Sequence, residues 1–409
     1  MTSSNSPIVR NKKKIAIVNI FYPPKALGGA TRIVTDEVSY LLKKYGDEYE
    51  IVVFTANTES SDHYKLTVYP IDGYRVYSVS IALTASTNWH EKDAHMYSIF
   101  SEFLKFECPD IIHFHCIQAM TGSIVEAAID LKVPYGVTLH DAWWISDHQF
   151  LVDQFGGVYP NGHPDPFAKI VLRDGVSLER SLIRRDYLKG LLNKANTVLT
   201  VSDCFREIYK NNGVSNAVTN KNGISESLVW SRKKTSSTNK VVCAHIGGMS
   251  AHKGFNLFFD GVTAFKGQNI EVLVVDHEKD ASYRLETKWG NTSVVIVGRI
   301  EHYKIVNLYE QIDVLFAPST CAESYGLVSR EALACGCWVV ASDIGAIGED
   351  INSNNGFKIS PSKNNLLNVL NKINSAPAKY KGYSVTSDIR YSSTQTDELV
   401  NIFRGILIN

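Results

Sequence analysis

Short apolar runs alternate with amphipathic stretches along the chain. The first run, KIAIVNI at 14–20, is nearly continuous, which is typical of a strand buried on both faces of a parallel sheet. A loop with two prolines and two glycines follows, and then Val34, Val38, Leu41 and Tyr45 recur at the spacing of one helix face. The pattern therefore predicts a strand, a glycine-containing loop and a helix at the start of the chain.

The same alternation continues in two series. Further strand-like runs occur at 49–54, 74–79, 110–114, 135–139 and 197–201. A polar stretch, SRKKTSSTNK at 231–240, interrupts the pattern, and a second series follows at 241–246, 270–275, 293–297, 313–317 and 337–342. Strands that alternate with helices favour parallel, doubly wound α/β sheets.

We therefore predict two Rossmann-like domains joined near 210–220, with residues 1–212 in the first domain and 213–387 in the second. An amphipathic segment within 388–409 predicts a C-terminal helix that returns to the first domain. Ligands of open parallel sheets bind beyond the carboxyl ends of the strands, so the expected site is the cleft that the two domains face.

Composition and charge narrow the function classes. The 409 residues are 44% hydrophobic, and 42 basic residues balance 42 acidic ones, which argues against a nucleic-acid-binding protein. One basic cluster, Arg10, Lys12, Lys13 and Lys14, is interpreted as a solvated flank or as a contact for an anionic membrane surface. Neither a signal peptide nor a membrane span is predicted, so we expect a cytoplasmic protein, at most at the inner face of the membrane.

Metal or disulfide chemistry is not indicated by the cysteines and histidines. The seven cysteines are scattered without a CxxC pair, which is typical of reduced thiols. A site built from His140, His148 and His163 is conceivable, but their spacing matches no metal motif. We therefore predict no metal and no cofactor.

The most specific signal is PSTCAESYGLVSREALACG at 318–336. Glu323 follows the apolar strand DVLFA, Gly326 makes a turn, and a helix is expected to begin near Leu327 with Glu331 about one turn inside it. Free N–H groups at a helix start favour an anion, so this loop is suited to a diphosphate. Each glutamate alone is more simply a helix or loop charge, but the pair in this setting favours binding of ribose and sugar hydroxyls.

The segment that contains these two glutamates, from "PS" to "EALACG", resembles the signature of the family 4 retaining glycosyltransferases, which have the GT-B fold. The resemblance extends over most of the chain and implies a nucleotide-sugar donor, no metal, and transfer with retained configuration. It implies that Glu331 holds the ribose and that Glu323 contacts the transferred sugar. Backbone groups near the phosphates would come from Ser324, Tyr325, Gly326, Leu327 and Val328.

A second segment, HIGGMSAHKG at 245–254, is similar to the family's Gly-Arg…Lys-Gly loop, in which both cations neutralise the diphosphate. Lys253 keeps the lysine, but Gly248 stands where the arginine is expected. His252 or Arg299 could compensate, and Arg299 could also stack on the base. A further departure is the stretch VVDHEK at 274–279, where Asp276 and His277 replace a Gly-x-Gly turn of the family.

The first half carries the expected acceptor side. Gly28 and Gly29 follow the first strand, as does a glycine pair of the family that faces the donor phosphates. His113 and His115 alternate at the end of DIIHF; the resemblance makes His113 structural and places His115 towards the acceptor. His140 and Asp141 follow YGVTL, and the resemblance places His140 near the transferred sugar. The predicted catalytic residues are therefore His140, Asp141 and Glu323.

Aromatic residues after His140 complete this side of the prediction. Trp143 and Trp144 could wall the acceptor pocket, although core packing is the better interpretation for at least one of them. The predicted acceptor is a glycan, lipid-linked or small-molecule hydroxyl, in surface polysaccharide or glycoconjugate biosynthesis. Alternatives are a phosphorylase or epimerase of the same fold, or a catalytically weak nucleotide- or sugar-binding protein.

Overall fold

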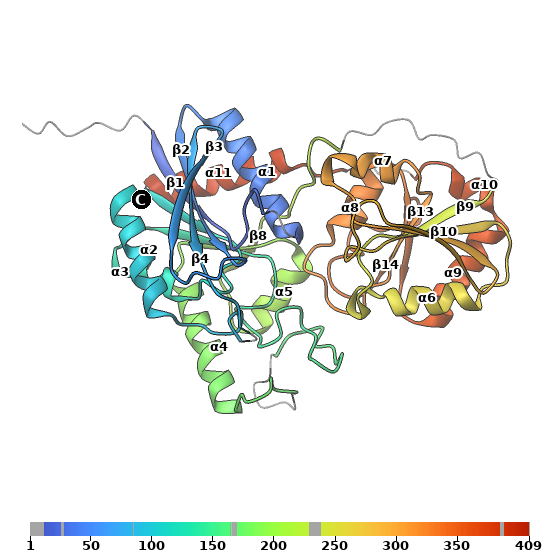
Figure 1. Ribbon diagram of the computed structural model, residues 1–409, viewed down its shortest axis with the longest axis horizontal. Helices are drawn as coiled ribbons and strands as arrows, with labels where there is room; N and C mark the ends of the chain where they lie inside the picture. Colours follow the sequence, from blue (N-terminus) through green and yellow to red (C-terminus); the bar gives the residue numbers. More distant parts are fainter. Residues whose placement is uncertain are drawn as a thin grey trace, which may run out of the picture.

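The computed structural model describes residues 12–25, 28–84, 86–163, 165, 170–228, 239–384 and 388–408. Two α/β domains lie side by side, each with one twisted sheet between helices (Figure 1). Arg10 of the basic cluster and most of the polar stretch at 231–240 fall outside the described residues. No described helix is both long and apolar enough to cross a membrane.

The first domain is built on a sheet in the order β3-β4-β2-β1-β5-β6-β7-β8, in which every pair is parallel except β3 with β4. Its strands are β1 (Lys13–Val18), β2 (Tyr49–Asn57), β3 (Leu66–Ile71), β4 (Tyr74–Ser80), β5 (Ile111–Phe114), β6 (Tyr135–Leu139), β7 (Thr197–Thr200) and β8 (Ala217–Thr219). Its helices are α1 (Gly28–Tyr45), α2 (Ala94–Glu107), α3 (Ser123–Asp130), α4 (Leu178–Asn193), α5 (Asp203–Asn211) and α11 (Ser392–Ile408).

The second domain has a sheet in the order β11-β12-β10-β9-β13-β14-β15, again parallel except for the pair β11 and β12. Its strands are β9 (Val241–His245), β10 (Ile270–Val275), β11 (Arg284–Trp289), β12 (Thr292–Val297), β13 (Val314–Ala317), β14 (Trp338–Ser342) and β15 (Gly356–Ile359). Its helical segments are η1 (Ala251–Lys253), α6 (Phe255–Ala264), η2 (His302–Lys304), α7 (Ile305–Tyr309), α8 (Leu327–Ala334), α9 (Lys363–Ser375) and α10 (Pro377–Lys381).

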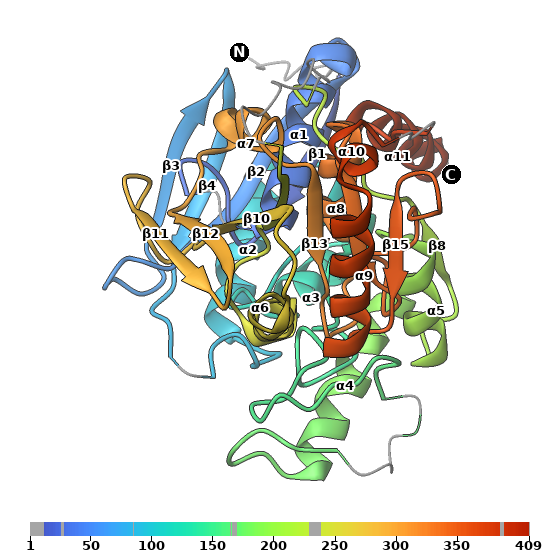
Figure 2. The ribbon, with the colours of Figure 1, turned by 90° about the vertical axis from the view of Figure 1, so that its right-hand side faces the viewer.

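Both faces of each sheet are covered, which explains the continuous apolar runs. In β1, Ile15 and Ile17 pack towards α1 and α11, whereas Ala16 and Val18 pack in a core with residues of α2 and α3. In the second domain α6 and α9 cover one face and α7 and α8 the other (Figure 2). A central parallel strand therefore has no polar face, and its sequence does not alternate.

The predicted parallel, doubly wound sheets are confirmed, and each also has one antiparallel strand at an edge. The antiparallel strands β3 and β11 were not predicted, because their sequences LTVYPI and RLETKW are mostly exposed and lack an apolar run. The short strand β8 was also missed, and it pairs with β7 in the first sheet. Since β8 lies beyond residue 212, we place the division between the domains after β8 rather than at 212/213.

The last helix returns to the first domain, as predicted. Leu399, Val400 and Phe403 of α11 join the core that also contains residues of α1. Lys44 of α1 pairs with Asp397 at 2.7 Å. The returning chain passes beside the outgoing one, where Ile224 and Tyr391 form a parallel bridge, so two segments connect the domains.

Candidate active site

The loop from β13 to α8 supplies one wall of the site. Gly326, just before α8, has φ +83°, and a Cβ atom there would lie 2.6 Å from Ile347 Cγ1. No side chain among the described residues caps α8, and although the Ser329 N–H donates to the Gly326 carbonyl at 3.3 Å, the N–H groups of Leu327 and Val328 remain available to an anion. The predicted helix start at Leu327 is confirmed, and the turn before it requires glycine for conformation and for space.

Glu323 lies in this loop and is already paired. Its Oε1 accepts hydrogen bonds from Lys253 Nζ at 2.8 Å and from Ser319 Oγ at 2.7 Å. Burial alone would raise the pKa of Glu323, but Lys253 and Ser319 outweigh burial and hold the pKa below its ordinary value. The structure thus brings together two residues that the sequence predicted separately, one for the sugar and one for the diphosphate.

Glu331 lies one turn inside α8, and its side chain is only 1% exposed. Its Oε2 accepts a hydrogen bond from Tyr309 Oη at 2.8 Å, and Oε1 pairs with Arg32 Nη2. Tyr309 ends α7, whereas Arg32 lies in α1 of the first domain. Sequence reasoning missed both partners, although Arg32 ends the segment PPKALGGATR that contains the glycine pair.

The two domains are in contact at this point. The helices α1 and α8 meet near their N-terminal ends, so that a Cβ atom on Gly29 would lie 2.9 Å from Leu327 Cδ1. Nearby, Ser202 Oγ donates a hydrogen bond to the Ser324 carbonyl at 2.6 Å. Gly29 of the first domain is therefore adjacent to the start of α8 in the second domain.

A buried histidine cluster lies at the ends of β5 and β6. His113 contacts Glu37 Oε1 through Nδ1 at 2.9 Å and Thr138 Oγ1 through Nε2 at 2.7 Å, which suits the structural role expected of it. His115 Nδ1 lies 2.9 Å from His140 Nε2. Burial lowers the pKa of His115 to about 4 and that of His140 well below its ordinary value, so both rings are neutral at pH 7.

The same cluster has atoms suited to metal ligation. Glu37, His113 and His115 each offer a ligand atom, and these atoms all lie within 4.8 Å of one another. Both nitrogens of His113 are engaged in hydrogen bonds, however, so ligation would require those bonds to be given up. His148 and His163 lie elsewhere, against Tyr159, and do not join His140.

Two family models match consecutive parts of the sequence. "Glycosyltransferase Family 4" matches residues 27–227, and "Glycosyl transferases group 1" matches residues 228–382. The chain belongs to the family 4, group 1 glycosyltransferases. The predicted GT-B fold agrees with solved structures that cover nearly the whole chain.

Among those structures are sucrose-phosphate synthase from Thermosynechococcus elongatus (TM-score 0.70, 15% identity, 97% of this chain and 100% of that chain) and Anabaena HepE in complex with UDP and glucose (TM-score 0.64, 17% identity, 96% and 100%). A GDP-mannose-dependent phosphatidylinositol dimannoside mannosyltransferase of Mycobacterium tuberculosis is 26% identical over 170 residues, which are 39% of this chain and 44% of that protein. An uncharacterized glycosyltransferase of Methanocaldococcus jannaschii is 20% identical over 342 residues (82% and 80%).

In this glycosyltransferase the backbone at Gly248, the position of the family's phosphate-binding arginine, does not suit an arginine. Gly248 has φ +89°, and a Cβ atom there would lie 3.2 Å from His277 Cδ2. An arginine at this position would thus be strained and would crowd His277, one of the residues that replace the family's Gly-x-Gly turn. The two sequence departures lie in contact and belong to one altered loop arrangement.

The proposed substitutes for that arginine differ in charge and position. His252 stacks on Phe150, and burial, followed by the charge of Lys253, lowers its pKa, so it is not a cation at neutral pH. Arg299 is exposed after β12, and its backbone N–H donates a hydrogen bond to the Lys279 carbonyl at 3.0 Å. Its predicted contact with the base stays a prediction.

Trp143 and Asp141 were predicted as acceptor-side and catalytic residues, and the structure places both in the packed interior of the first domain. Trp143 is only 2% exposed, and its Nε1 donates to the Asn88 carbonyl at 2.5 Å, so the ring packs in the core and does not wall an open pocket. Asp141 is buried and accepts hydrogen bonds from Gln118, Gln149 and the backbone N–H of Trp143. Burial raises the pKa of Asp141 to about 6, and its three donors indicate a role in shaping the loop.

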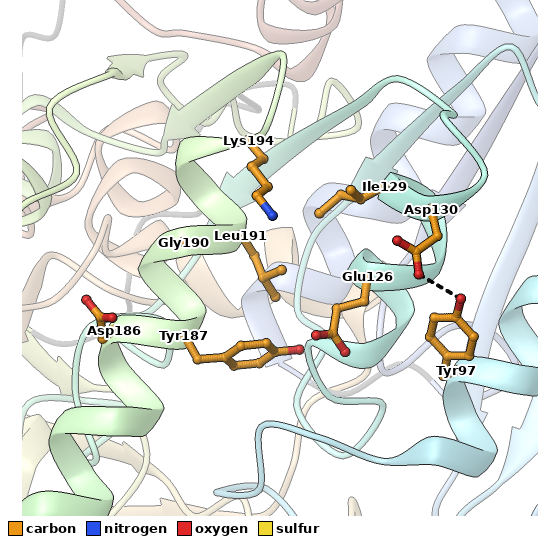
Figure 3. A pocket seen from close by; sticks show the side chains of 9 residues that line it. All are labelled: Tyr97, Glu126, Ile129, Asp130, Asp186, Tyr187, Gly190, Leu191 and Lys194. Atoms are coloured by element: carbon orange, nitrogen blue, oxygen red, sulfur yellow. Dashed lines mark hydrogen bonds between the residues drawn. The ribbon is translucent and has the colours of Figure 1, made fainter.

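A separate surface pocket of about 490 Å³ lies between α2, α3 and α4 (Figure 3). Tyr97 donates a hydrogen bond to Asp130 at its rim at 2.8 Å, and the Tyr187 ring points towards Glu126. None of the predicted site residues lines this pocket. Its lining residues are Tyr97, Glu126, Ile129, Asp130, Asp186, Tyr187, Gly190, Leu191 and Lys194.

Proposed function

We propose that this glycosyltransferase transfers a sugar from a nucleotide-diphosphate sugar to an acceptor hydroxyl with retention of configuration and without a metal. The observation that carries the proposal is the convergence of the uncapped start of α8, the pair Lys253–Glu323 and the buried Glu331. These groups match the three parts of such a donor, which are the diphosphate, the sugar and the ribose.

The diphosphate is the leaving group, so its developing charge has to be stabilised as the anomeric C–O bond breaks. The first N–H groups of α8 and the Lys253 ammonium are the groups suited to this task. Lys253 is held 2.8 Å from Glu323, which positions it for a diphosphate on one side and a sugar on the other. The departing nucleoside diphosphate carries away the electron pair of the broken bond.

The acceptor oxygen attacks from the side of the first domain and forms the new glycosidic bond. His140 is partly exposed at the end of β6, and its Nε2 is held by His115, so its Nδ1 is the nitrogen left to face a substrate. We infer that His140 contacts the transferred sugar and that Glu323 holds its hydroxyls. In a front-face reaction the leaving phosphate itself can take the acceptor proton, so no enzymatic base is assigned.

The acceptor class is proposed from weaker support. The mannosyltransferase similar to part of this chain acts, by its name, on phosphatidylinositol dimannoside with GDP-mannose. GDP-mannose is therefore the first donor to test, and a lipid-linked or glycan acceptor at the inner face of a membrane is the first class to test. Lys12 and Lys13 are exposed at the start of β1 and provide the described part of a basic flank that suits an anionic surface, whereas Lys14 is buried and paired with Glu107.

The test is release of nucleoside diphosphate from a panel of UDP-, GDP- and ADP-sugars in EDTA, followed by proton NMR of the product to read its anomeric configuration. Glu323→Gln keeps the shape of the side chain and should lower turnover by at least tenfold, whereas Glu286→Gln, on the exposed strand β11, should not. Turnover that requires added metal, or an inverted product, would refute the proposal.

The alternatives give different results in the same assay. Nucleotide binding without turnover on any donor and acceptor would favour a catalytically weak binding protein, which the loss of the arginine at Gly248 keeps open. Consumption of free phosphate would favour a phosphorylase, and interconversion of the sugar without transfer would favour an epimerase.

A further inference from the structure

An arginine of the first domain contacts the proposed ribose-binding carboxylate of the second. Arg32 and Glu331 are 299 residues apart in the sequence, and their side chains pair across the domain boundary. The Arg32 side chain is 29% exposed and that of Glu331 is 1% exposed. Arg32 Nε is buried and has no hydrogen-bond partner among the described residues, so the guanidinium retains unused donor capacity.

In the described part of the second domain, few cationic side chains are available to a diphosphate at the start of α8. Lys253 is already paired with Glu323, and the position of the family arginine is occupied by Gly248. Arg330, on α8, is directed to backbone carbonyls and to Asp350 at 2.8 Å. A diphosphate carries at least two negative charges, which the start of α8 and one shared lysine would neutralise only in part.

The Arg32 guanidinium lies close to where such a diphosphate would bind. Gly29, less than one turn before Arg32 in α1, approaches Leu327, the first residue of α8. Glu331 is four residues further along α8, a rise of about 6 Å. Arg32 therefore lies beside the stretch of α8 from its start to Glu331, and a guanidinium suits bidentate contact with phosphate.

We propose that Arg32 supplies, from the first domain, the donor-diphosphate cation that the second domain lacks. In the ligand-free arrangement Arg32 pairs with Glu331. When the ribose hydroxyls donate hydrogen bonds to the Glu331 carboxylate, the Arg32 side chain is released and binds the diphosphate. This inference rests on the proposed function, because it requires a nucleoside diphosphate at α8.

The proposal links donor binding to the approach of the two domains. Lys253 and α8 belong to one domain and can hold a diphosphate whether or not the other domain is near, whereas Arg32 reaches it only when α1 and α8 meet. A diphosphate would thus favour the closed arrangement, and a nucleoside without phosphates would not gain this contact.

The experiment compares binding of a nucleoside diphosphate with binding of its nucleoside, by isothermal titration calorimetry in EDTA. The base is whichever of uracil, guanine or adenine the wild type prefers. We expect Arg32→Ala to weaken diphosphate binding about 10- to 100-fold and to leave nucleoside binding unchanged or tighter, because the competing ion pair with Glu331 is gone. Arg32→Lys keeps one charge and should recover part of the loss.

Arg404→Ala is the matched control, since Arg404 also belongs to the first domain and forms a partly exposed ion pair, with Glu48, away from the site. Equal changes in diphosphate and nucleoside binding, or no change in either, would overturn the role of Arg32 while leaving the donor site intact. A wild type that binds neither ligand would overturn the proposed function itself, so the two failures are distinguishable.

Discussion

Replacing Glu331 by glutamine tests the donor site most directly. The amide has the shape of the carboxylate, and the side chain is fully enclosed, so the change removes charge without creating a cavity. In the free protein the amide oxygen can still accept from Arg32, while the Tyr309 hydroxyl can turn to accept from the new N–H group. The variant replaces an ion pair with a hydrogen bond from Arg32 to a neutral amide, which should lower the free energy of unfolding by about 1 kcal/mol.

The effect on binding should be larger than the effect on stability. Hydrogen bonds to a charged group contribute about 1.5–3 kcal/mol, and the ribose hydroxyls would make theirs to a carboxylate that the enclosed site keeps from water. The wild type must break its Arg32–Glu331 ion pair to bind the ribose, whereas the variant has no such pair. This difference offsets up to about 1 kcal/mol of the lost binding free energy. We therefore expect a net loss of about 1–2 kcal/mol, which is a roughly 5- to 30-fold weaker Kd for the nucleoside diphosphate.

The assay is calorimetric titration with UDP, GDP and ADP in EDTA, with thermal unfolding as a second measurement. At 100 times its Kd a ligand stabilises the wild type by about 2.7 kcal/mol, and at the same concentration the variant should gain about 1–2 kcal/mol. Glu286→Gln, whose side chain is 72% exposed on β11, is the control and should behave as the wild type.

One result would refute this reasoning. If Glu331→Gln is folded, with an unfolding temperature near that of the wild type, and binds the same diphosphate within twofold, the carboxylate does not hold the ribose. The assignment of α8 as the donor helix would then lose its principal support.

Three further predictions follow from contacts around the site. Lys253→Met should weaken diphosphate binding at least tenfold with little effect on the nucleoside, because one phosphate cation is lost; equal weakening of both ligands would contradict this. Lowering the pH from 7 to 5 should destabilise the protein by about 2 kcal/mol through His115 alone, since its folded pKa of about 4 lies below the ordinary 6.5 and the unfolded chain binds the proton first. Urea unfolding should show a shallower pH dependence for His115→Asn, and an unchanged slope would be inconsistent with the burial argument. Tyr325→Phe removes the donor to the Asn222 carbonyl at 2.5 Å and should lower the free energy of unfolding by about 1–3 kcal/mol in the same measurement, with a loss below about 0.5 kcal/mol counting against a buried hydrogen bond there.

Much of the fold could be predicted because parallel strands buried on both faces leave continuous apolar runs in the sequence. The runs at 14–20, 241–246 and 313–317 correspond to β1, β9 and β13. The edge strands β3 and β11 could not be found in this way, because exposed residues dominate them and each forms only by pairing with the neighbouring strand. The same limit applies to β8, whose three residues carry little pattern of their own.

The residues of the candidate site likewise include some that the sequence indicates and some that it does not. Glu323 and Glu331 stand out because strand ends, glycine turns and helix starts are local features of the sequence. Lys253 stands out only through the resemblance of its loop to that of the family. Which of Trp143 and Trp144 packs in the core could not be predicted, since an aromatic side chain looks the same in a sequence whether it faces a ligand or other side chains; both are buried in the structure.

The sequence by itself thus determined the two α/β domains, the start of α8 and the charged residues around it. Only the tertiary structure decided which of these charges are paired: Lys253 with Glu323, and Arg32 with Glu331. The physical reason is that hydrophobic period and turn chemistry act over a few neighbouring residues. An ion pair between residues 299 positions apart depends on how two finished domains pack, and no local pattern records that packing.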